Sequence, residues 1–193
     1  SRARPTIIYL TDGGGPERVG QTRDALAAIG LEGDAVFLNH TEASFYNALL
    51  AGDVEFFLDI SKQLEPYLAS VKPDQIWCDA IEFYNPVHDV TVPIVRAAMQ
   101  DHPDIELYEV PLIYQEEAPQ ESYRIQTVPE SLQNNVERIH LTDAELKAKI
   151  HARDKTYTLL REQMGEGFRN APAENFRSEL LFASPVDSKP GNG

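Results

Sequence analysis

A single histidine beside an Asn-Pro turn carries the most chemical information in this sequence. His88 lies in the segment Glu-Phe-Tyr-Asn-Pro-Val-His-Asp, residues 82–89. An imidazole can bind a metal ion or accept a proton near neutral pH. An apolar run precedes the segment and a helical pattern follows it, and open α/β sheets carry their active sites in such loops. His88 is therefore the best candidate for a metal ligand or a catalytic base; the alternative is a loop histidine hydrogen-bonded to solvent.

Other polar side chains occupy similar positions after predicted strands. Asp12 and Glu42 could hydrogen-bond sugar hydroxyls, although helix capping and plain surface charge are competing interpretations. Asp89 could orient the imidazole of His88 from behind, but capping of the following helix is favoured. The triglycine 13–15 could hold a phosphate at a helix N-terminus. No G-x-G-x-x-G pattern accompanies it, so it is a weak nucleotide signature.

Alternating apolar runs and helical patterns must position these residues. The sequence predicts an α/β fold with a Rossmann-like, open, mostly parallel sheet and helices on both faces. One domain is expected over residues 1–183, followed by a disordered tail at 184–193. Strands are expected at 6–10, 35–38, 75–78 and 107–110, and helices at 17–29, 52–71, 90–100 and 142 to about 164. The last of these helices opens on Thr142 and Glu145, which have the form of a capping box.

The composition narrows the classes of partner. The chain has 193 residues, a formal net charge of −14 and 42% hydrophobic residues, which suits one domain with a real core. An acidic chain is a poor ligand for a nucleic acid or an anionic membrane. No apolar run reaches the roughly 18 residues of a membrane span. The single cysteine, Cys78, is expected in the core, and a cytoplasmic protein is the default expectation. The oligomeric state stays open, with a homo-oligomer as one option.

Several short motifs resemble, in order, those of the PIG-L/LmbE-like family of zinc-dependent N-deacetylases. The resemblance runs from about Ile7 to Phe182. Gln21, Ile29 and Asn85 stand where the family often has Glu, Leu and His. The matching segments are Thr11-Asp12-Gly13, the helix positions Arg18, Gln21, Ala25, Ile29 and Gly30, then Val36-Phe37-Leu38 with Glu42, Lys72-Pro73-Asp74-Gln75-Ile76, Asn85-Pro86-Val87-His88, and the late helix containing Lys147, Lys155 and Tyr157.

The resemblance implies a role for each of three residues. It makes His88 the third ligand of a zinc or other divalent ion, and Arg18 a contact of the substrate. It makes Asn85 a donor to the oxyanion, although the Asn-Pro pair could equally just form the turn, and Arg18 could be a solvated surface charge. The family's H-P-D-D-E element, which supplies two metal ligands and the general base, is absent from this sequence. We expect it in an N-terminal segment that precedes Ser1. The similar-looking His102-Pro103-Asp104 follows a predicted helix and is expected to be a surface turn.

Three hypotheses follow for the function. The first is a metal-dependent amide hydrolase that removes an acetyl group from an N-acetylated amino sugar or a similar small glycoside. The second is a non-catalytic relative of the same fold that binds a sugar-like ligand. The third is a Rossmann-like nucleotide-binding protein that uses the triglycine loop.

Overall fold

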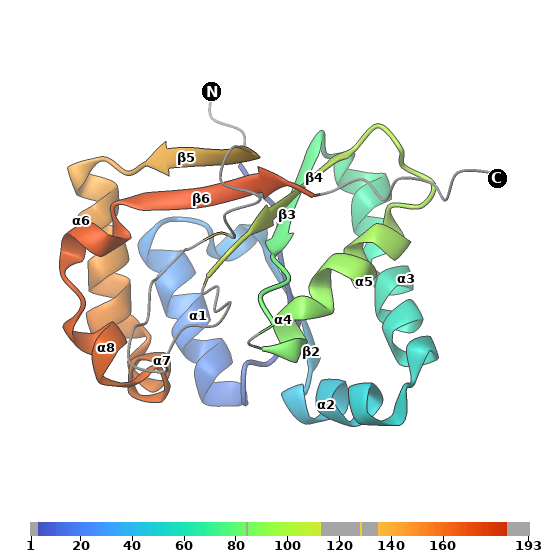
Figure 1. Ribbon diagram of the computed structural model, residues 1–193, viewed down its shortest axis with the longest axis horizontal. Helices are drawn as coiled ribbons and strands as arrows, with labels where there is room; N and C mark the ends of the chain where they lie inside the picture. Colours follow the sequence, from blue (N-terminus) through green and yellow to red (C-terminus); the bar gives the residue numbers. More distant parts are fainter. Residues whose placement is uncertain (1–3, 84, 113–127, 129–134, 185–193) are drawn as a thin grey trace.

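The computed structural model describes residues 4–83, 85–112, 128 and 135–184, arranged as a mixed α/β fold (Figure 1). The strands are β1 (Ile7–Thr11), β2 (Ala35–His40), β3 (Gln75–Asp79), β4 (Glu106–Val110), β5 (Val136–His140) and β6 (Ser178–Ala183). The α-helices are α1 (Pro16–Ala28), α2 (Glu42–Ala51), α3 (Val54–Val71), α4 (Pro86–Asp89), α5 (Thr91–Ala98), α6 (Asp143–His151), α7 (Thr158–Gln163) and α8 (Gly165–Asn170). Short helical turns are η1 (Glu32–Asp34), the π-helical η3 (Ala152–Thr156) and η4 (Ala173–Phe176).

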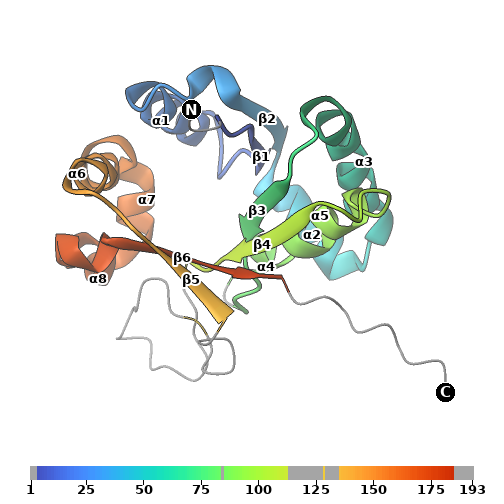
Figure 2. The same cartoon turned by 90° about the horizontal axis from the view of Figure 1, so that it is seen from above.

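The strands form two sheets rather than one. β1 and β2 pair in parallel, and a second sheet has the order β3-β4-β6-β5. β3 and β4 are parallel, whereas β6 runs antiparallel to both of its neighbours. Seen from above, the β1-β2 pair stands apart from the four-stranded sheet (Figure 2). The α/β expectation is therefore confirmed, but a single, mostly parallel Rossmann-like sheet is not what the described strands form.

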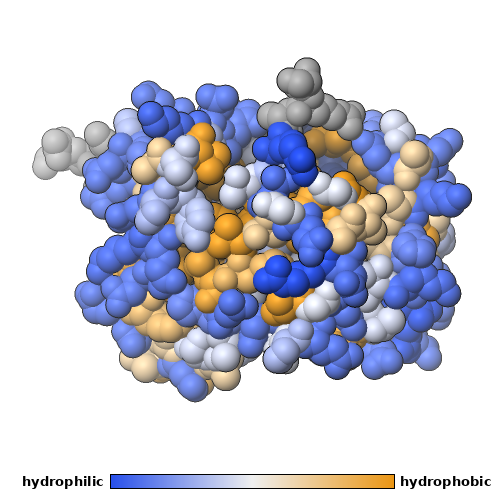
Figure 3. Space-filling view, turned by 180° about the vertical axis from the view of Figure 1, so that it is seen from behind, coloured by the Kyte–Doolittle hydropathy of each residue, from blue (hydrophilic) through white to orange (hydrophobic). Residues whose placement is uncertain are grey.

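The first strand is less buried than expected, because its short β-branched and apolar run is typical of a fully buried strand. All five residues of β1 are only half-buried, although Ile7, Ile8 and Leu10 are apolar. Within the described chain β1 pairs with β2 alone and β3 with β4 alone, so each strand has one side without a ladder partner. On the back of the molecule, apolar side chains gather in a hollow across the middle of the face (Figure 3). Because one edge of β1 has no neighbouring strand in the described chain, its apolar residues stay partly accessible to solvent.

The main core lies between the four-stranded sheet and the helices α3 and α5. Phe45 of α2 and Ile60 of α3 are almost completely buried there, with Cys78 of β3, as expected, packed beside them. Asp53 caps α3 by accepting a hydrogen bond from the Phe56 amide at 3.2 Å. Pro66 lies inside α3 without dividing it, so the predicted 52–71 helix is confirmed as one element. No helix within the described ranges combines the length and apolar character needed to cross a membrane.

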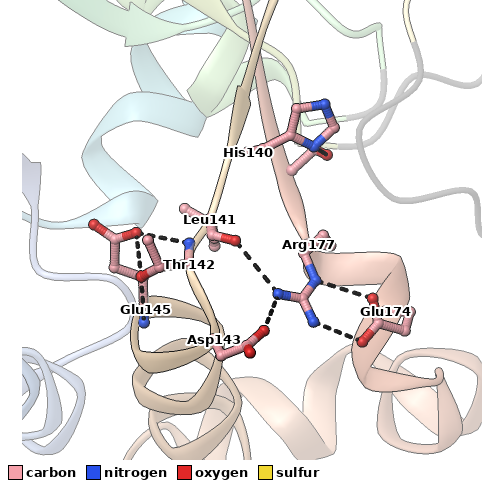
Figure 4. Close-up of polar contacts among 8 residues, drawn as sticks. His140, Leu141, Thr142, Asp143, Glu145, Glu174 and Arg177 are labelled. Atoms are coloured by element: carbon pink, nitrogen blue, oxygen red, sulfur yellow. Dashed lines mark hydrogen bonds and ion pairs between the residues drawn. The ribbon is translucent and has the colours of Figure 1, made fainter.

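The predicted helix from 142 to about 164 is wrong in its second half. The capping box at its start is confirmed, since the Thr142 hydroxyl accepts from the Glu145 amide and the Glu145 carboxylate accepts from the Thr142 amide (Figure 4). The helix then widens into the π-helix η3 and stops at Tyr157, whose φ of −89° and ψ of 57° are not helical. α7 and α8 follow as separate short helices. π-Helical turns often mark functional positions.

Candidate functional site

The loops that follow β2 and β3 meet at one end of the molecule. In Figure 1 both strands run toward the helices α2 and α4, which lie at the bottom of the view. The two helices contact each other, and β1 ends beside β2 because the pair is parallel. The predicted site residues after these three strands therefore belong to the same end of the fold, as open α/β sheets require. The sequence alone could not show that β1 and β3 belong to different sheets.

His88 lies on α4 with its ring at this end of β3. Its side chain is 32% exposed, whereas its Nδ1 atom is inaccessible to solvent and has no hydrogen-bond partner in the described structure. A carboxylate oxygen of Asp79, the last residue of β3, lies 4.0 Å from that nitrogen. Burial raises the pKa of Asp79, and the nearby His88 opposes this shift. Because 46% of the Asp79 side chain stays accessible to solvent, both the burial effect and the effect of His88 are moderate. Sequence reasoning missed Asp79, although a carboxylate ending the preceding strand was a usable signal.

Asn85 shapes the turn that carries His88. Its side-chain oxygen accepts from the Val87 amide at 3.0 Å, which makes Asn85 the N-cap of α4. Its backbone carbonyl accepts from the His88 amide at 2.9 Å. The turn-forming interpretation of Asn85 is thus confirmed. Because the side-chain oxygen is engaged in capping, the amide nitrogen is the atom that can donate to a ligand.

Asp89 braces the loop before α4 instead of capping the helix after it. Its Oδ1 accepts from the amides of Glu82 at 2.7 Å and Phe83 at 3.2 Å. The favoured prediction, a cap of the following helix, is therefore wrong, since α5 has Val90 at its N-cap position without a side-chain cap. The carboxylate that faces the His88 ring is that of Asp79. Asp89 holds Phe83 at a φ of 55°, a left-handed conformation that is unusual for a bulky residue.

Arg18 projects from the first turn of α1 onto an aromatic ring. Its guanidinium carbon lies 4.5 Å from the ring centroid of Tyr157, a cation–π contact. Burial lowers the pKa of Arg18, and Tyr157, Glu42 and Tyr9 oppose that change. The Nη1 atom is buried without a hydrogen-bond partner in the described structure. The interpretation of Arg18 as a solvated surface charge is therefore wrong.

The surroundings of Arg18 come from distant parts of the chain. Gln21, on the same face of α1, donates from its amide nitrogen to the Thr158 hydroxyl at 3.0 Å. This contact joins α1 to the start of α7 just after the π-helix. Gly13 must be glycine, because a Cβ atom there would lie 2.8 Å from the Arg18 Cγ, at a φ of 60°. Tyr9 and Tyr157 were not predicted as site residues, since nothing in their local sequence reveals that they converge on Arg18.

Asp12 and Glu42 have structural partners of their own. Asp12 Oδ1 accepts from the Gly14 amide at 3.1 Å and so closes the glycine turn. Glu42 is in the first turn of α2, whose N-cap is Thr41, and its charge acts on Arg18. His40 packs edge-on against Phe45 and Phe56, as part of the aromatic cluster under α2. Asp12 and Glu42 thus border the Arg18 region, where both carboxylates could accept from ligand hydroxyls.

A metal at His88 needs further ligands. Within the described ranges, no group of three or more His, Cys, Asp or Glu residues could hold a metal ion. Catalytic zinc takes about three protein ligands. The His88 ring, about one-third exposed and with a carboxylate 4.0 Å from its Nδ1, fits one of these positions. His102 lies in the turn between α5 and β4, hydrogen-bonded through its amide to the Met99 carbonyl, as expected for a surface turn.

Two solved structures share this fold. The crystal structure of the A40926 pseudoaglycone deacetylase Dbv21 superposes with a TM-score of 0.65 at 14% sequence identity, covering 94% of this chain and 85% of that chain. A triple mutant of a deacetylase involved in the teicoplanin biosynthetic pathway, Orf2*T, gives a TM-score of 0.55 at 12% identity, covering 89% and 71%. No protein-family model matches the sequence. No curated protein matches it either. At this identity the two structures establish a shared fold.

Proposed function

We propose that this protein is a metal-dependent amide hydrolase that removes an acyl group, such as acetyl, from an N-acylated amino sugar or a similar small glycoside. The main support for this proposal is the Asp79–His88 pair at the carboxyl end of β3. The fold that holds this pair is shared with a deacetylase over 94% of the chain. A carboxylate behind a histidine nitrogen is the arrangement that orients metal-binding imidazoles. The remaining ligands would come from residues outside the described part.

His88 and Asp79 would act as a unit. A proton on Nδ1 would face the Asp79 carboxylate, which leaves Nε2 as the ligand atom. The 4.0 Å separation is longer than a hydrogen bond, so the two groups would have to approach by about 1 Å when the ring is engaged. A bound divalent ion supplies a water of lowered pKa and polarises the amide carbonyl.

Asn85 would stabilise the negative charge that develops on the amide oxygen. Its side-chain oxygen is fixed on the Val87 amide, so the orientation of the NH2 group is fixed as well. A donor that is held in place before the reaction does not need to reorganise as charge develops. An amide can donate this bond without carrying a charge of its own.

Arg18, Asp12 and Glu42 would hold the sugar. The guanidinium packs on the Tyr157 ring, and its buried Nη1 has no partner among the described residues, so it can donate to a hydroxyl or carbonyl oxygen of the ligand. The two carboxylates can accept from sugar hydroxyls. The triglycine loop favours a neutral ligand over a phosphate, because the Asp12 carboxylate already occupies the Gly14 amide. This geometry disfavours the nucleotide-binding alternative.

The test uses the complete protein and the matched variants His88→Ala and His102→Ala. Bound metal is measured by mass spectrometry and acetate release from N-acetylglucosamine derivatives is measured by assay. His88→Ala should lose metal and activity, whereas His102→Ala, a histidine in the turn before β4, should retain both. Unchanged metal content and activity in His88→Ala would refute the assignment. Sugar binding without acetate release would favour the non-catalytic alternative.

A further inference from the structure

The loop before His88 exposes an aromatic side chain on a strained backbone. Phe83 is 82% exposed, and its φ of 55° is one that bulky residues rarely adopt. Backbone outliers of this kind persist where the surrounding structure enforces them, and they cluster at ligand sites. Phe83 precedes the proposed metal ligand, His88, by five positions in the chain. The exposed ring therefore belongs to the loop that leads into the proposed metal ligand.

Buried polar contacts hold this segment against the end of β4. The Ala80 amide donates to the Val110 carbonyl at 3.1 Å. The carboxylate of Glu82, which is only 2% exposed, accepts from the Leu112 amide. These bonds place residues 80–83 beside residues 110–112, while Asp89 fixes the Phe83 amide from the other direction. The strain at Phe83 is thus built into the loop and is not a feature of a free chain end.

Three exposed apolar side chains belong to these two adjacent segments. Ile81 is 39% exposed and Leu112 is 44% exposed, next to Phe83 at 82%. The buried carboxylates of Glu82 and Glu109 accept from the Leu112 and Ile81 amides, so the backbone here is held from inside while part of each apolar side chain stays accessible. We call Ile81, Phe83 and Leu112 the apolar rim. An apolar surface beside a polar catalytic group is typical of small-molecule sites.

The positions of the two strand pairs indicate which part of the substrate would contact the apolar rim. Arg18, Asp12 and Glu42 belong to the β1-β2 side, whereas the apolar rim belongs to the β3-β4 side, with His88 following β3. In the proposed function the sugar occupies the first side and the scissile carbonyl faces His88. The acyl group then points toward the β3-β4 side.

We infer that the apolar rim is a binding site for the acyl group, and that the protein prefers N-acyl chains longer than acetyl. This inference rests on the proposed function for its orientation. Phe83 is a specificity-determining residue in it, because its ring offers the largest exposed apolar surface of the three. Each buried methylene of a longer chain adds to binding through the hydrophobic effect.

The experiment compares glucosamine carrying N-acetyl, N-butanoyl or N-hexanoyl groups. The ratio of kcat/KM for hexanoyl over acetyl is measured for the wild type, Phe83→Ala, Leu112→Ser and the control Leu50→Ala. Leu50 is 88% exposed at the end of α2, outside the rim. The wild type and the control should favour hexanoyl by about tenfold, the gain expected if roughly two of its four additional methylenes are buried, and both rim variants should lose most of that preference. Calorimetric binding of the same compounds to His88→Ala provides a readout that needs no catalysis.

The two readouts separate the inference from the function on which it rests. If no compound is hydrolysed but hexanoyl still binds more tightly than acetyl, and Phe83→Ala abolishes the difference, the hydrolase proposal fails and the acyl site stands. If the wild type treats all three chains alike in both measurements, the acyl site is overturned while hydrolysis can stand. An undiminished hexanoyl preference in both rim variants overturns it as well.

Discussion

The Asp79 carboxylate oxygen lies 4.0 Å from the Nδ1 atom of His88, and that nitrogen is closed to solvent. Asp79 ends β3 and His88 lies on α4, so the strand and the helix that follows its loop position the two groups together. The imidazole is consequently backed by a carboxylate on one side and is open on the other. The carboxylate therefore favours one orientation of the imidazole, whereas a solvent-exposed loop histidine would rotate freely.

In the proposed metal site, replacing Asp79 with Asn should weaken metal binding by about 10- to 100-fold, because a carboxylate behind a ligand histidine fixes the tautomer and orientation of its ring. The dissociation constant can be measured by competition with a zinc-binding dye on the complete protein. Asp104→Asn, in the turn before β4, is a matched control and should bind as the wild type does. Circular dichroism checks that the fold persists. If Asp79→Asn and Asp104→Asn bind the metal equally well, Asp79 has no role in metal binding.

The Tyr9 phenol should lose its proton at an unusually high pH. Burial, reinforced by Tyr157, raises the pKa of Tyr9 from 10.0 to about 12, while Arg18 opposes the change. The folded protein keeps this proton where the unfolded chain loses it, so the stabilising contribution is complete below pH 10 and is lost as the pH rises through about 12. The difference in phenolate absorbance between the wild type and Tyr9→Phe isolates this group. A difference titration centred near 10 would show that the ring is not enclosed.

At position 83 glycine should give a more stable fold than alanine. A left-handed conformation costs an ordinary residue about 1 kcal/mol, and glycine adopts it without that penalty. Phe83 is 82% exposed, so little packing is lost on truncation. Denaturant unfolding of Phe83→Gly should therefore give a free energy of unfolding about 1 kcal/mol above that of Phe83→Ala, which keeps the strain. Equal values for the two variants would mean that the loop relaxes and holds no strain.

The parallel part of the fold follows from local sequence patterns. The four runs predicted as strands correspond to β1–β4, and the Thr142 capping box begins α6 as expected. These elements carry short apolar runs or a specific cap, which are local signals. The helix α2 lacks such a signal, since Phe45 is buried while Leu50 is 88% exposed, so its apolar residues mark no single face. Residue propensities alone do not predict a helix there.

The antiparallel strands and the Arg18 cluster depend on contacts between distant segments. In β6, Leu180, Leu181 and Phe182 are all buried, so no alternation marks the strand. Its position between β4 and β5 is set by pairing that no local pattern reveals. Tyr157 reaches Arg18 only because the last predicted helix widens at η3 and ends there. The candidate site residues follow from residue type and position after a strand, whereas their contacts, such as Tyr157 with Arg18, emerge only from the tertiary structure.

The junction between β5, α6 and β6 should show an acid-dependent stability that Arg177 controls. Its guanidinium donates to both carboxylate oxygens of Glu174, at 3.0 and 2.9 Å, and to Asp143 at 2.6 Å (Figure 4). The hydrogen bond from Arg177 is the largest cause that lowers the pKa of Glu174 below its ordinary 4.5. A lowered carboxylate pKa stabilises the folded state above pH 4.5, and this contribution is lost as the pH falls through the folded value.

Glu174→Gln should therefore lie below the wild type in thermal stability at neutral pH, by a small margin because the pair faces solvent. The gap should close as the pH falls below 4.5, since protonated Glu174 no longer carries the charge that Arg177 recognises. Melting curves of the two proteins across that range measure the gap directly. Glu166→Gln, an exposed carboxylate in α8, is the control and should follow the wild type at every pH. A gap that stays constant with pH would mean that the charge of Glu174 is not what Arg177 recognises, and no gap at any pH would mean that Arg177 holds this corner through its other contacts, such as its bond to the Leu141 carbonyl.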